Sequence, residues 1–187
     1  MRNISFIIIC PLLGYRKGCR KFLRIKHFQE TVKKISSSFT SPDIVAVTGL
    51  HNKEYLNIKS GFRIVENQNP FDTGEIEQIR LGINNITNNK IVIIKEECSF
   101  DCSVIKTGIK TCNKFLIHGI NEENPGMIIN DNFVNNISFG LKNYFGDMIY
   151  TSSIEEIKEF IEKPHNRNKK LYELVNHLIN IEPIKIL

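Results

Sequence analysis

The sequence has no long apolar run. No stretch approaches the roughly 20 apolar residues that a helix needs to cross a bilayer. Ile4 to Cys10 is also too short for the core of a signal peptide, and no small-residue cleavage site follows it. We therefore expect a cytoplasmic protein that does not contact a membrane.

The cysteines lack any paired pattern. Their number is odd, and no C-x-x-C motif occurs: they are Cys10, Cys19, Cys98, Cys102 and Cys112. Without a secretion signal this is typical of reduced thiols and not of a disulfide framework. A zinc site would need closer pairing than Cys98 and Cys102 provide.

Aromatic residues are not interleaved with basic ones, as they would be in a surface that stacks nucleic-acid bases. The net charge of +5 is a mild excess, concentrated at Arg16 to Lys34 and at Lys163 to Lys170. This excess favours anionic ligands, but we do not expect nucleic acid as a partner. Alanine is nearly absent, since Ala46 is the only one; that bias is typical of an AT-rich genome and has no bearing on the fold.

The stretch from Ile4 to Leu23 combines a short apolar run with a basic loop. Ile4 to Cys10 is rich in isoleucine and is stopped by Pro11, which is typical of a buried strand. The following residues include Gly14, Gly18 and five basic side chains: Arg16, Lys17, Arg20, Lys21 and Arg24. Glycine lets backbone N–H groups approach an anion and basic side chains neutralise it, so the loop suits phosphate. The alternative is a strand followed by a solvated basic turn.

The first hundred residues alternate between strand and helix patterns. Four apolar runs predict strands of one sheet: Ile4 to Cys10, Asp43 to Leu50, Gly61 to Glu66 and Lys90 to Ile94. The segments between them predict helices: Phe22 to Ser38, His51 to Ile58 and Glu75 to Ile86. This order implies right-handed crossovers and a mainly parallel, doubly wound sheet, in which ligands bind at the carboxyl ends of the strands.

The second half of the sequence contains short strand patterns separated by turns. They are Lys114 to His118, Met127 to Asn130, Phe133 to Phe139 and Asp147 to Tyr150, with a hairpin turn at Asn130 to Asn132. Two more helices are expected, one ending near Lys163 and one over Leu171 to Ile179. Because there is no repeat and no clear boundary, we expect the 187 residues to form a single domain with a sizeable core.

Four blocks resemble the sugar-phosphate and molybdenum-cofactor nucleotidyltransferases in order and spacing. IIICPLLGYR, at Ile7 to Arg16, aligns without a gap with the opening of that family, roughly I-I-L-A-A-G-x-G-x-R. The other blocks are VAVTGLHNKEY at Val45 to Tyr55, VENQNPFDTGEIEQIRL at Val65 to Leu81 and IVIIKEECSFD at Ile91 to Asp101. They are similar to V-V-T-G-Y-x-x-E, V-x-N-P-x-Y-x-x-T-N-x-x-S-L and I-I-I-x-G-D-x-x-F. The resemblance covers roughly residues 4 to 101.

This resemblance implies a fold of the nucleotide-diphosphosugar transferase type. That fold is a three-layer α/β domain with a mainly parallel sheet and helices on both faces. Residues 1–101 would be the nucleotide-binding half, and residues 102–187 the acceptor half with the C-terminal helices. Such a protein would join a nucleoside triphosphate to a phosphorylated small molecule, with Mg²⁺ as cofactor, and release pyrophosphate.

The resemblance also assigns the phosphate site to the basic loop. Leu13 and Gly14 would lie where the loop wraps the nucleotide phosphates. Arg16 matches the arginine of the family opening and Lys21 the lysine of its K-P-L, so both would contact the phosphates as catalytic residues. Such chemistry needs positive charge on the phosphates and a metal, but no covalent nucleophile.

The remaining roles fall on the other strand ends. Gly49, Asn69 and Thr73 would hold the base and ribose, and Glu97, with Asp101 as a second candidate, would hold Mg²⁺. From the residues alone, Asn69 and Thr73 also suit a loop residue and a helix cap. Glu97 equally suits a solvated acidic turn, and Asp101 a cap of the helix that follows it.

Several positions depart from the family pattern, among them Cys10-Pro11 in place of its small pair and Glu97 in place of the metal aspartate. Leu12 stands in place of a glycine, Glu96 in place of the glycine before the metal aspartate, and Gly74 in place of the asparagine of the T-N pair. Leu12 adds a side chain where close approach of a phosphate needs none. The alternative function is therefore a catalytically eroded member that acts as a binding or structural module with a protein partner, as in a viral or host assembly.

Overall fold

The computed structural model describes residues 3–10, 19–50, 53–58, 61–119 and 122–187, and the side chains of all of these except residues 19–24. The strands in this part of the chain are β1 Ile4–Ile9, β2 Asp43–Thr48, β3 Arg63–Glu66, β4 Lys90–Lys95, β5 Lys114–His118, β6 Gly126–Asn130, β7 Phe133–Ser138, β8 Phe145–Thr151 and β9 Ile184–Ile186. The helices are α1 Cys19–Ser38, α2 Lys53–Leu56, α3 Glu75–Ile83, α4 Cys102–Thr111, α5 Glu155–Ile161, the 3-10 turn η1 Pro164–Asn166 and α6 Leu171–Ile181.

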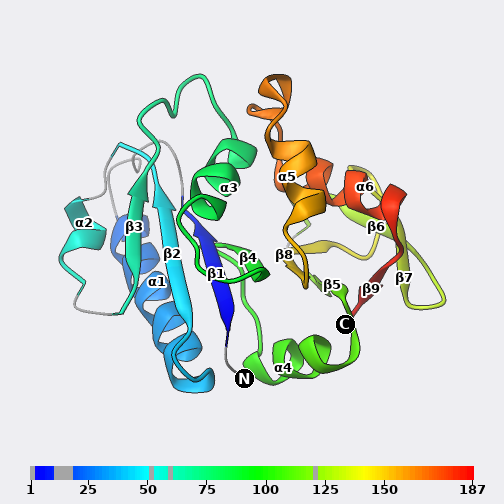
Figure 1. The fold of residues 1–187 in the computed structure, drawn as a ribbon, viewed down its shortest axis with the longest axis horizontal. Coiled ribbons are helices and arrows are strands. Elements are labelled where there is room, and N and C mark those ends of the chain that lie inside the picture. Colours follow the sequence, from blue (N-terminus) through cyan, green and yellow to red (C-terminus); the bar gives the residue numbers. More distant parts are fainter. Residues whose placement is uncertain (1–2, 11–18, 51–52, 59–60, 120–121) are drawn as a thin grey trace.

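All these strands form one sheet in the order β3-β2-β1-β4-β8-β5-β9-β7-β6 (Figure 1). The first four, β3, β2, β1 and β4, are parallel to one another, which confirms that the four predicted strands share one sheet. β1 and β4 are interior strands with a neighbour on each side, as their continuous apolar sequences indicate. The helices between these strands lie at their predicted places, although α3 ends three residues earlier than expected, at Ile83.

The second half of the sheet mixes parallel and antiparallel pairs. β8 runs antiparallel between β4 and β5, and β9 lies parallel to β5 but antiparallel to β7. The predicted hairpin joins β6 to β7. Its turn residues Asp131 and Asn132 have φ angles of 50° and 66°, a left-handed conformation that Asp and Asn tolerate.

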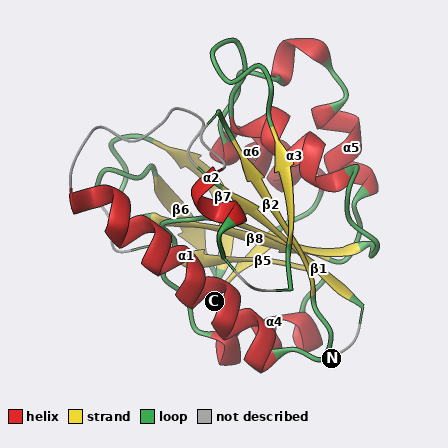
Figure 2. Ribbon diagram, turned by 90° about the vertical axis from the view of Figure 1, so that its left-hand side faces the viewer, coloured by secondary structure: helices red, strands yellow, loops and turns green. Residues whose placement is uncertain are grey.

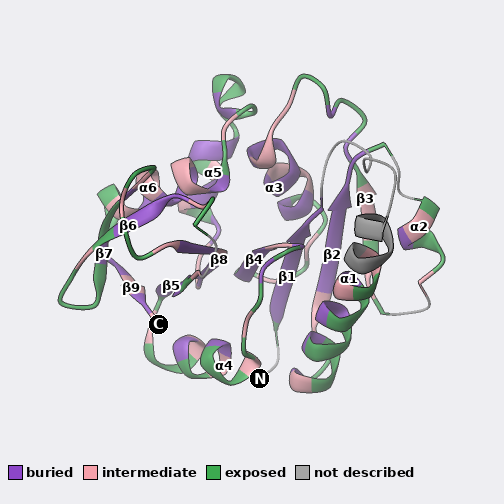
Figure 3. Ribbon diagram, turned by 180° about the vertical axis from the view of Figure 1, so that it is seen from behind, coloured by how far each residue is buried: buried purple, intermediate pink, exposed green. Residues whose placement is uncertain are grey.

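The helices cover both faces of the sheet, which confirms the three-layer α/β architecture. Figure 2 shows α1 and α4 on one side of the strands and α3, α5 and α6 on the other. Alternate side chains of β1 point to the two faces of the sheet. Ile7 and Ile9 pack toward α3, α5 and α6, whereas Phe6 and Ile8 pack toward α1 and α4. Figure 3 shows the central strands buried and the outer surfaces of α1 exposed. None of the described helices is long and apolar enough to cross a bilayer.

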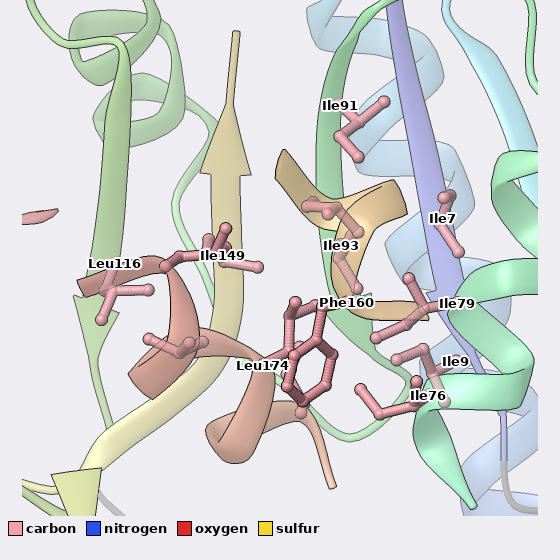
Figure 4. Close-up of a cluster of buried hydrophobic side chains, with 14 of the residues drawn as sticks. Ile7, Ile9, Ile76, Ile79, Ile91, Ile93, Leu116, Ile149, Phe160 and Leu174 are labelled. Atoms are coloured by element: carbon pink, nitrogen blue, oxygen red, sulfur yellow. The ribbon is translucent and has the colours of Figure 1, made fainter. Parts of the chain in front are cut away.

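Phe160 of α5 lies in the larger of the two apolar layers, the one between the sheet and α3, α5 and α6. Its ring lies among Ile79 of α3, Leu174 of α6 and Ile93 of β4 (Figure 4). Ile79, Leu174 and Ile93 are completely buried, and Phe160 is 6% exposed. Phe160 thus connects the two C-terminal helices to the first half of the sheet.

Asp43, the first residue of β2, connects the ends of β1, β2 and β3 with the loop before β4. Its Oδ2 atom accepts hydrogen bonds from the hydroxyl of Ser5 at 2.7 Å and from the backbone N–H of Thr87 at 2.8 Å, and Oδ1 forms an ion pair with Arg63. Burial alone would raise the pKa of Asp43, but the hydrogen bonds from Ser5 and Thr87 and the charge of Arg63 lower it below 3.8.

We expect Asp43→Asn to lower the free energy of unfolding by about 1.5–3 kcal/mol at pH 7, because the hydrogen bonds lose their charged acceptor. A carboxylate with a lowered pKa stabilises the fold above its unfolded-state pKa and loses that effect as the pH falls. Urea unfolding should therefore show that the difference in free energy of unfolding between wild type and variant shrinks as the pH drops below 3.8. Asp72→Asn, at an exposed loop position, is the matched control. An equal difference at pH 7 and pH 3 would contradict this role.

Candidate functional site

A cleft of about 960 Å³ opens at the carboxyl ends of β1 and β4. One wall comes from the first half of the chain, through Cys10 after β1 and the start of α3. The end of β4 and the turn after it, from Lys95 to Ser99, contribute a second wall. Residues of the second half complete the cleft: His118, Gly119, Glu123, Asn124, Gly146, Asp147 and Lys170. The position agrees with the expectation that ligands bind at the carboxyl ends of these strands.

Gln78 fixes α3 at the edge of the cleft. Its side-chain amide donates hydrogen bonds to the carbonyl of Cys10 at 2.6 Å and to the carbonyl of Val47 at 3.0 Å. Cys10 directly follows β1, and Val47 is the second-last residue of β2. The buried side chain of Gln78 therefore connects α3 to the ends of both strands. Gln78 is not among the site residues predicted from the sequence. The available signal was a polar residue between Ile76 and Ile79 on the apolar side of a helix.

The loop before α3 is closed by its own side chains. Asn67 donates from its amide to the hydroxyl of Thr73 at 2.8 Å, and that hydroxyl donates to the carbonyl of Asn69 at 2.6 Å. Thr73 lines the cleft, whereas Asn69 is exposed and lies outside the lining. The interpretation of Thr73 as a helix cap is wrong, because the N-cap is Gly74 and no side chain caps it. Contact of Asn69 and Thr73 with a base stays a prediction.

The segment before α6 covers the N-terminus of α3. The N–H of Gly74 donates to the carbonyl of Arg167 at 2.7 Å, and the N–H of Ile76 donates to the carbonyl of Lys169 at 3.2 Å. A Cβ atom on Gly74 would lie 2.6 Å from the carbonyl oxygen of Asn168. This close approach gives a physical reason for glycine where the family pattern has asparagine.

The two glutamates after β4 have different surroundings. Glu96 is 1% exposed, and both of its carboxylate oxygens lie within hydrogen-bond distance of the hydroxyl of Tyr55, at 3.0 and 3.1 Å. Glu97 is exposed and lines the cleft. Asp101 is outside the lining and caps α4, where its carboxylate accepts from the N–H of Ser103 at 2.7 Å. The cap interpretation of Asp101 is confirmed, and the metal roles of Glu97 and Asp101 stay predictions.

Lys95 forms the centre of a polar network in the cleft. Its ammonium nitrogen is 2.7 Å from Asp147 Oδ1 and 3.2 Å from Glu75 Oε1. Burial by itself would lower the pKa of Lys95, but the two carboxylates together raise it above 10.5. The side chain is therefore fully charged at neutral pH. None of these three residues is predicted as a site residue from the sequence, because they are far apart in the chain.

Two buried cysteines border the cleft without being reactive. Burial, and secondly the charge of Asp147, raises the pKa of the Cys98 thiol to about 12. Burial, and secondly Glu96, also raises the pKa of Cys10 well above its usual value. Both thiols stay protonated at neutral pH and are poor nucleophiles. Cys10, Cys98, Cys102 and Cys112 form no disulfide, as expected.

Several predicted site residues lie outside the described part of the chain. Leu13, Gly14 and Arg16 fall between residues 11 and 18, and the side chain of Lys21, in the first turn of α1, is also outside. Gly49 is buried directly after β2 and does not line the cleft. The roles of these five residues stay predictions.

The described carboxylates of the cleft do not form a ready-made metal site. Across residues 3–10, 19–50, 53–58, 61–119 and 122–187, no three or more His, Cys, Asp or Glu side chains lie where they could hold one metal ion together. In the cleft, Glu75 and Asp147 converge on the ammonium of Lys95 instead of on an open position.

The sequence matches no protein-family model and no curated protein sequence. The structure does resemble solved nucleotidyltransferases. The inositol-1-phosphate CTP transferase from T. maritima superposes with a TM-score of 0.71 at 13% identity, covering 97% of this chain and 84% of that one. UDP-glucose pyrophosphorylase in complex with UDP-glucose gives a TM-score of 0.67 at 12% identity, covering 98% and 89%.

CTP:phosphocholine cytidylyltransferase (LicC) from Streptococcus pneumoniae gives a TM-score of 0.60 at 15% identity, covering 99% of this chain and 89% of that one. Identities this low establish a shared fold and no more. The likeness extends over nearly the whole chain, including residues 102–187, where the sequence resemblance fades. The chain thus has the fold of the sugar-phosphate nucleotidyltransferases, as a divergent example of it.

Proposed function

We propose that the cleft binds a nucleoside triphosphate and a phosphorylated small molecule and joins them with release of pyrophosphate. One observation carries this proposal: blocks that are far apart in the sequence, and that resemble one family, meet around one cleft. The first block contributes Ile9 and Cys10, and the fourth Lys95 to Ser99. The third contributes five residues: Pro70, Thr73, Gly74, Glu75 and Gln78. The second block reaches the same place through Tyr55, which bonds to Glu96.

The two halves of the cleft would hold the two substrates. Arg16 and Lys21, with the loop at Leu13 and Gly14, would contact the nucleotide phosphates from the β1 side. Residues 102–187 would form the acceptor half, where His118 and Asn124 line the wall. A cleft of about 960 Å³ is large enough for a nucleotide and a small acceptor side by side.

The reaction would be a direct displacement at phosphorus. A phosphate oxygen of the acceptor forms a bond to the α-phosphorus of the nucleotide, and the bond from that phosphorus to the bridging oxygen breaks. Pyrophosphate carries away the electron pair. No covalent nucleophile is needed, which agrees with the protonated thiols of Cys10 and Cys98. Glu75 and Asp147 are paired with Lys95 and are therefore not open to the Mg²⁺ that the sequence resemblance implies.

A non-catalytic binding or structural module is the second candidate. Glu96 favours it, because a buried carboxylate bonded to Tyr55 occupies the position of the glycine in the family pattern. In that case the fold would serve a protein partner, and neither nucleotide binding nor turnover would occur.

Thermal denaturation with ATP, CTP, GTP or UTP tests the proposed function. A nucleotide at about 100 times its Kd should stabilise the protein by about 2.7 kcal/mol, which is roughly 5–10 °C for a chain of this size. The corresponding nucleoside is the control and should give a much smaller shift. Release of pyrophosphate when phosphorylated acceptors are added would distinguish the enzyme from the module. Absence of a shift with all four nucleotides would rule out the proposed function.

A further inference from the structure

Lys95 is the last residue of β4, and its ammonium group lies in the wall of the cleft. Successive side chains of a strand point to opposite faces, so Lys95 lies on the same face as Ile91 and Ile93. Those two side chains are completely buried, whereas 27% of the Lys95 side chain is exposed. The charge therefore emerges from the apolar core where the central strand opens into the cleft.

Two carboxylates that are themselves anchored hold this ammonium group. Glu75 and Asp147 each point one oxygen at Lys95 Nζ. The second oxygen of Glu75 accepts from the N–H of Leu171, and the second oxygen of Asp147 accepts from the amide of Asn124, both at 2.7 Å. Because both carboxylates are fixed from behind, the long lysine side chain has one defined position.

One donor of this group is left for a ligand. An ammonium has three N–H donors, and two of them face Glu75 and Asp147. The third has no partner among the described residues, and Lys95 lines the cleft. An N–H of a charged lysine that meets a phosphate oxygen makes a short, charge-assisted hydrogen bond, about twice as strong as a neutral one.

A divalent ion and this ammonium compete for the same two carboxylates. Mg²⁺ needs a near-octahedral shell of oxygens at about 2.0–2.1 Å. The oxygens of Glu75 and Asp147 that would enter such a shell already point at Lys95 Nζ. A second cation between them would also be repelled by the lysine charge.

We propose that the ammonium of Lys95 is a built-in cation of the cleft, which donates its third N–H to a phosphate oxygen of the substrate and makes phosphate binding independent of a divalent metal. This inference rests on the proposed function, because it takes the ligand to be a phosphate. A lysine supplies less charge than Mg²⁺ does, and the basic residues from Arg16 to Arg24 are the further source of positive charge in the sequence.

Mn²⁺ alone provides a test that needs no nucleotide. By electron paramagnetic resonance, we expect the wild-type chain to show no saturable Mn²⁺ binding up to about 1 mM. Lys95→Met should bind one Mn²⁺ per chain, because it leaves Glu75 and Asp147 facing each other without a cation. Adding Asp147→Asn should abolish that gain. Lys95→Gln replaces the methionine variant if circular dichroism shows that the latter does not fold.

Two results with Mn²⁺ would overturn the inference. The first is stoichiometric binding by the wild type that Glu97→Gln removes, which would establish a metal at the position that the sequence resemblance predicts. The second is a folded Lys95 variant that binds no Mn²⁺, which would show that Glu75 and Asp147 do not form a cation position.

Nucleotide titration then tests the ligand. With the nucleoside triphosphate that gives the largest thermal shift, calorimetry should yield Kd values within about threefold in EDTA and in Mg²⁺. Lys95→Met should weaken binding in EDTA by about tenfold or more, and Lys95→Arg by less. Wild-type binding that weakens more than about tenfold in EDTA would overturn the inference but leave the proposed function intact. Failure of every nucleotide to bind under both conditions would instead reject the proposed function, and the Mn²⁺ results would still decide the role of Lys95.

Discussion

Replacing Phe160 with alanine should lower the free energy of unfolding by about 3–5 kcal/mol, the range for truncating a large aromatic side chain in a core. The ring is 6% exposed and packs with residues of α3, α6 and β4 (Figure 4). It also lies 4.9 Å, centroid to centroid, from the ring of His177. The substitution leaves a cavity, and the surrounding helices are anchored by other buried residues. The cavity therefore cannot close fully, and the loss of free energy of unfolding stays large.

Chemical unfolding monitored by circular dichroism measures this effect, and the melting temperature should fall by roughly 10 °C. Phe71→Ala is the matched control, because it removes the same ring from a residue that is 73% exposed. It should change the free energy of unfolding by no more than about 0.5 kcal/mol. Equal losses in the two variants would show that Phe160 does not hold α5 to the rest of the core.

Gly74→Ala should lower the free energy of unfolding by about 1–3 kcal/mol or more, the range for overpacking a tight contact. The added methyl group would lie 2.6 Å from the carbonyl oxygen of Asn168 and 2.8 Å from that of Lys169. Both atoms belong to the backbone, so relief requires moving the segment that accepts hydrogen bonds from the N–H groups of Gly74 and Ile76. We expect the same variant to bind nucleotides more weakly, because Gly74 and Lys170 both line the cleft.

Gly61→Ala is the control for this substitution. An added Cβ at Gly61 would meet nothing within 4 Å. That variant should be neutral or stabilise the protein slightly, by reducing the freedom of the unfolded chain. A Gly74→Ala variant as stable as Gly61→Ala would contradict the tight approach of the Asn168–Lys169 backbone to α3.

The sequence predicts the first half of the fold well, because parallel strands buried on both faces are continuous apolar runs such as FIII and IVII. It does not show that β8 inserts between β4 and β5, since nothing local encodes the partner of a strand. β9, with three residues directly after Pro183, is too short to give a pattern.

The candidate site was predicted only in part, because some of its residues come together only through tertiary contacts. The position of the cleft follows from the ends of the strands, and Thr73 and Glu97 do line it. Lys95, Glu75 and Asp147 become one network only when α3, β4 and β8 are brought together. In sequence, Lys95 is merely a polar residue at the end of a strand. Polar networks of this kind depend on tertiary contacts that no short motif records.

The position of β9 has a consequence for how the protein is made. Among the described residues, β6 and β7 are joined to the rest of the sheet through β9 and through one isolated bridge between Gly126 and Tyr144. Helix α6 also binds this hairpin, because the side chain of Asn176 forms hydrogen bonds with both the N–H and the carbonyl of Ile137. Both α6 and β9 follow the hairpin in the chain, so on the ribosome the hairpin is synthesised well before its anchors. Until they emerge it has its own short ladder, which is marginally stable in water, and the bonds of Met127 to the carbonyls of Lys142 and Asn143. We therefore expect it to dock as a late step of folding.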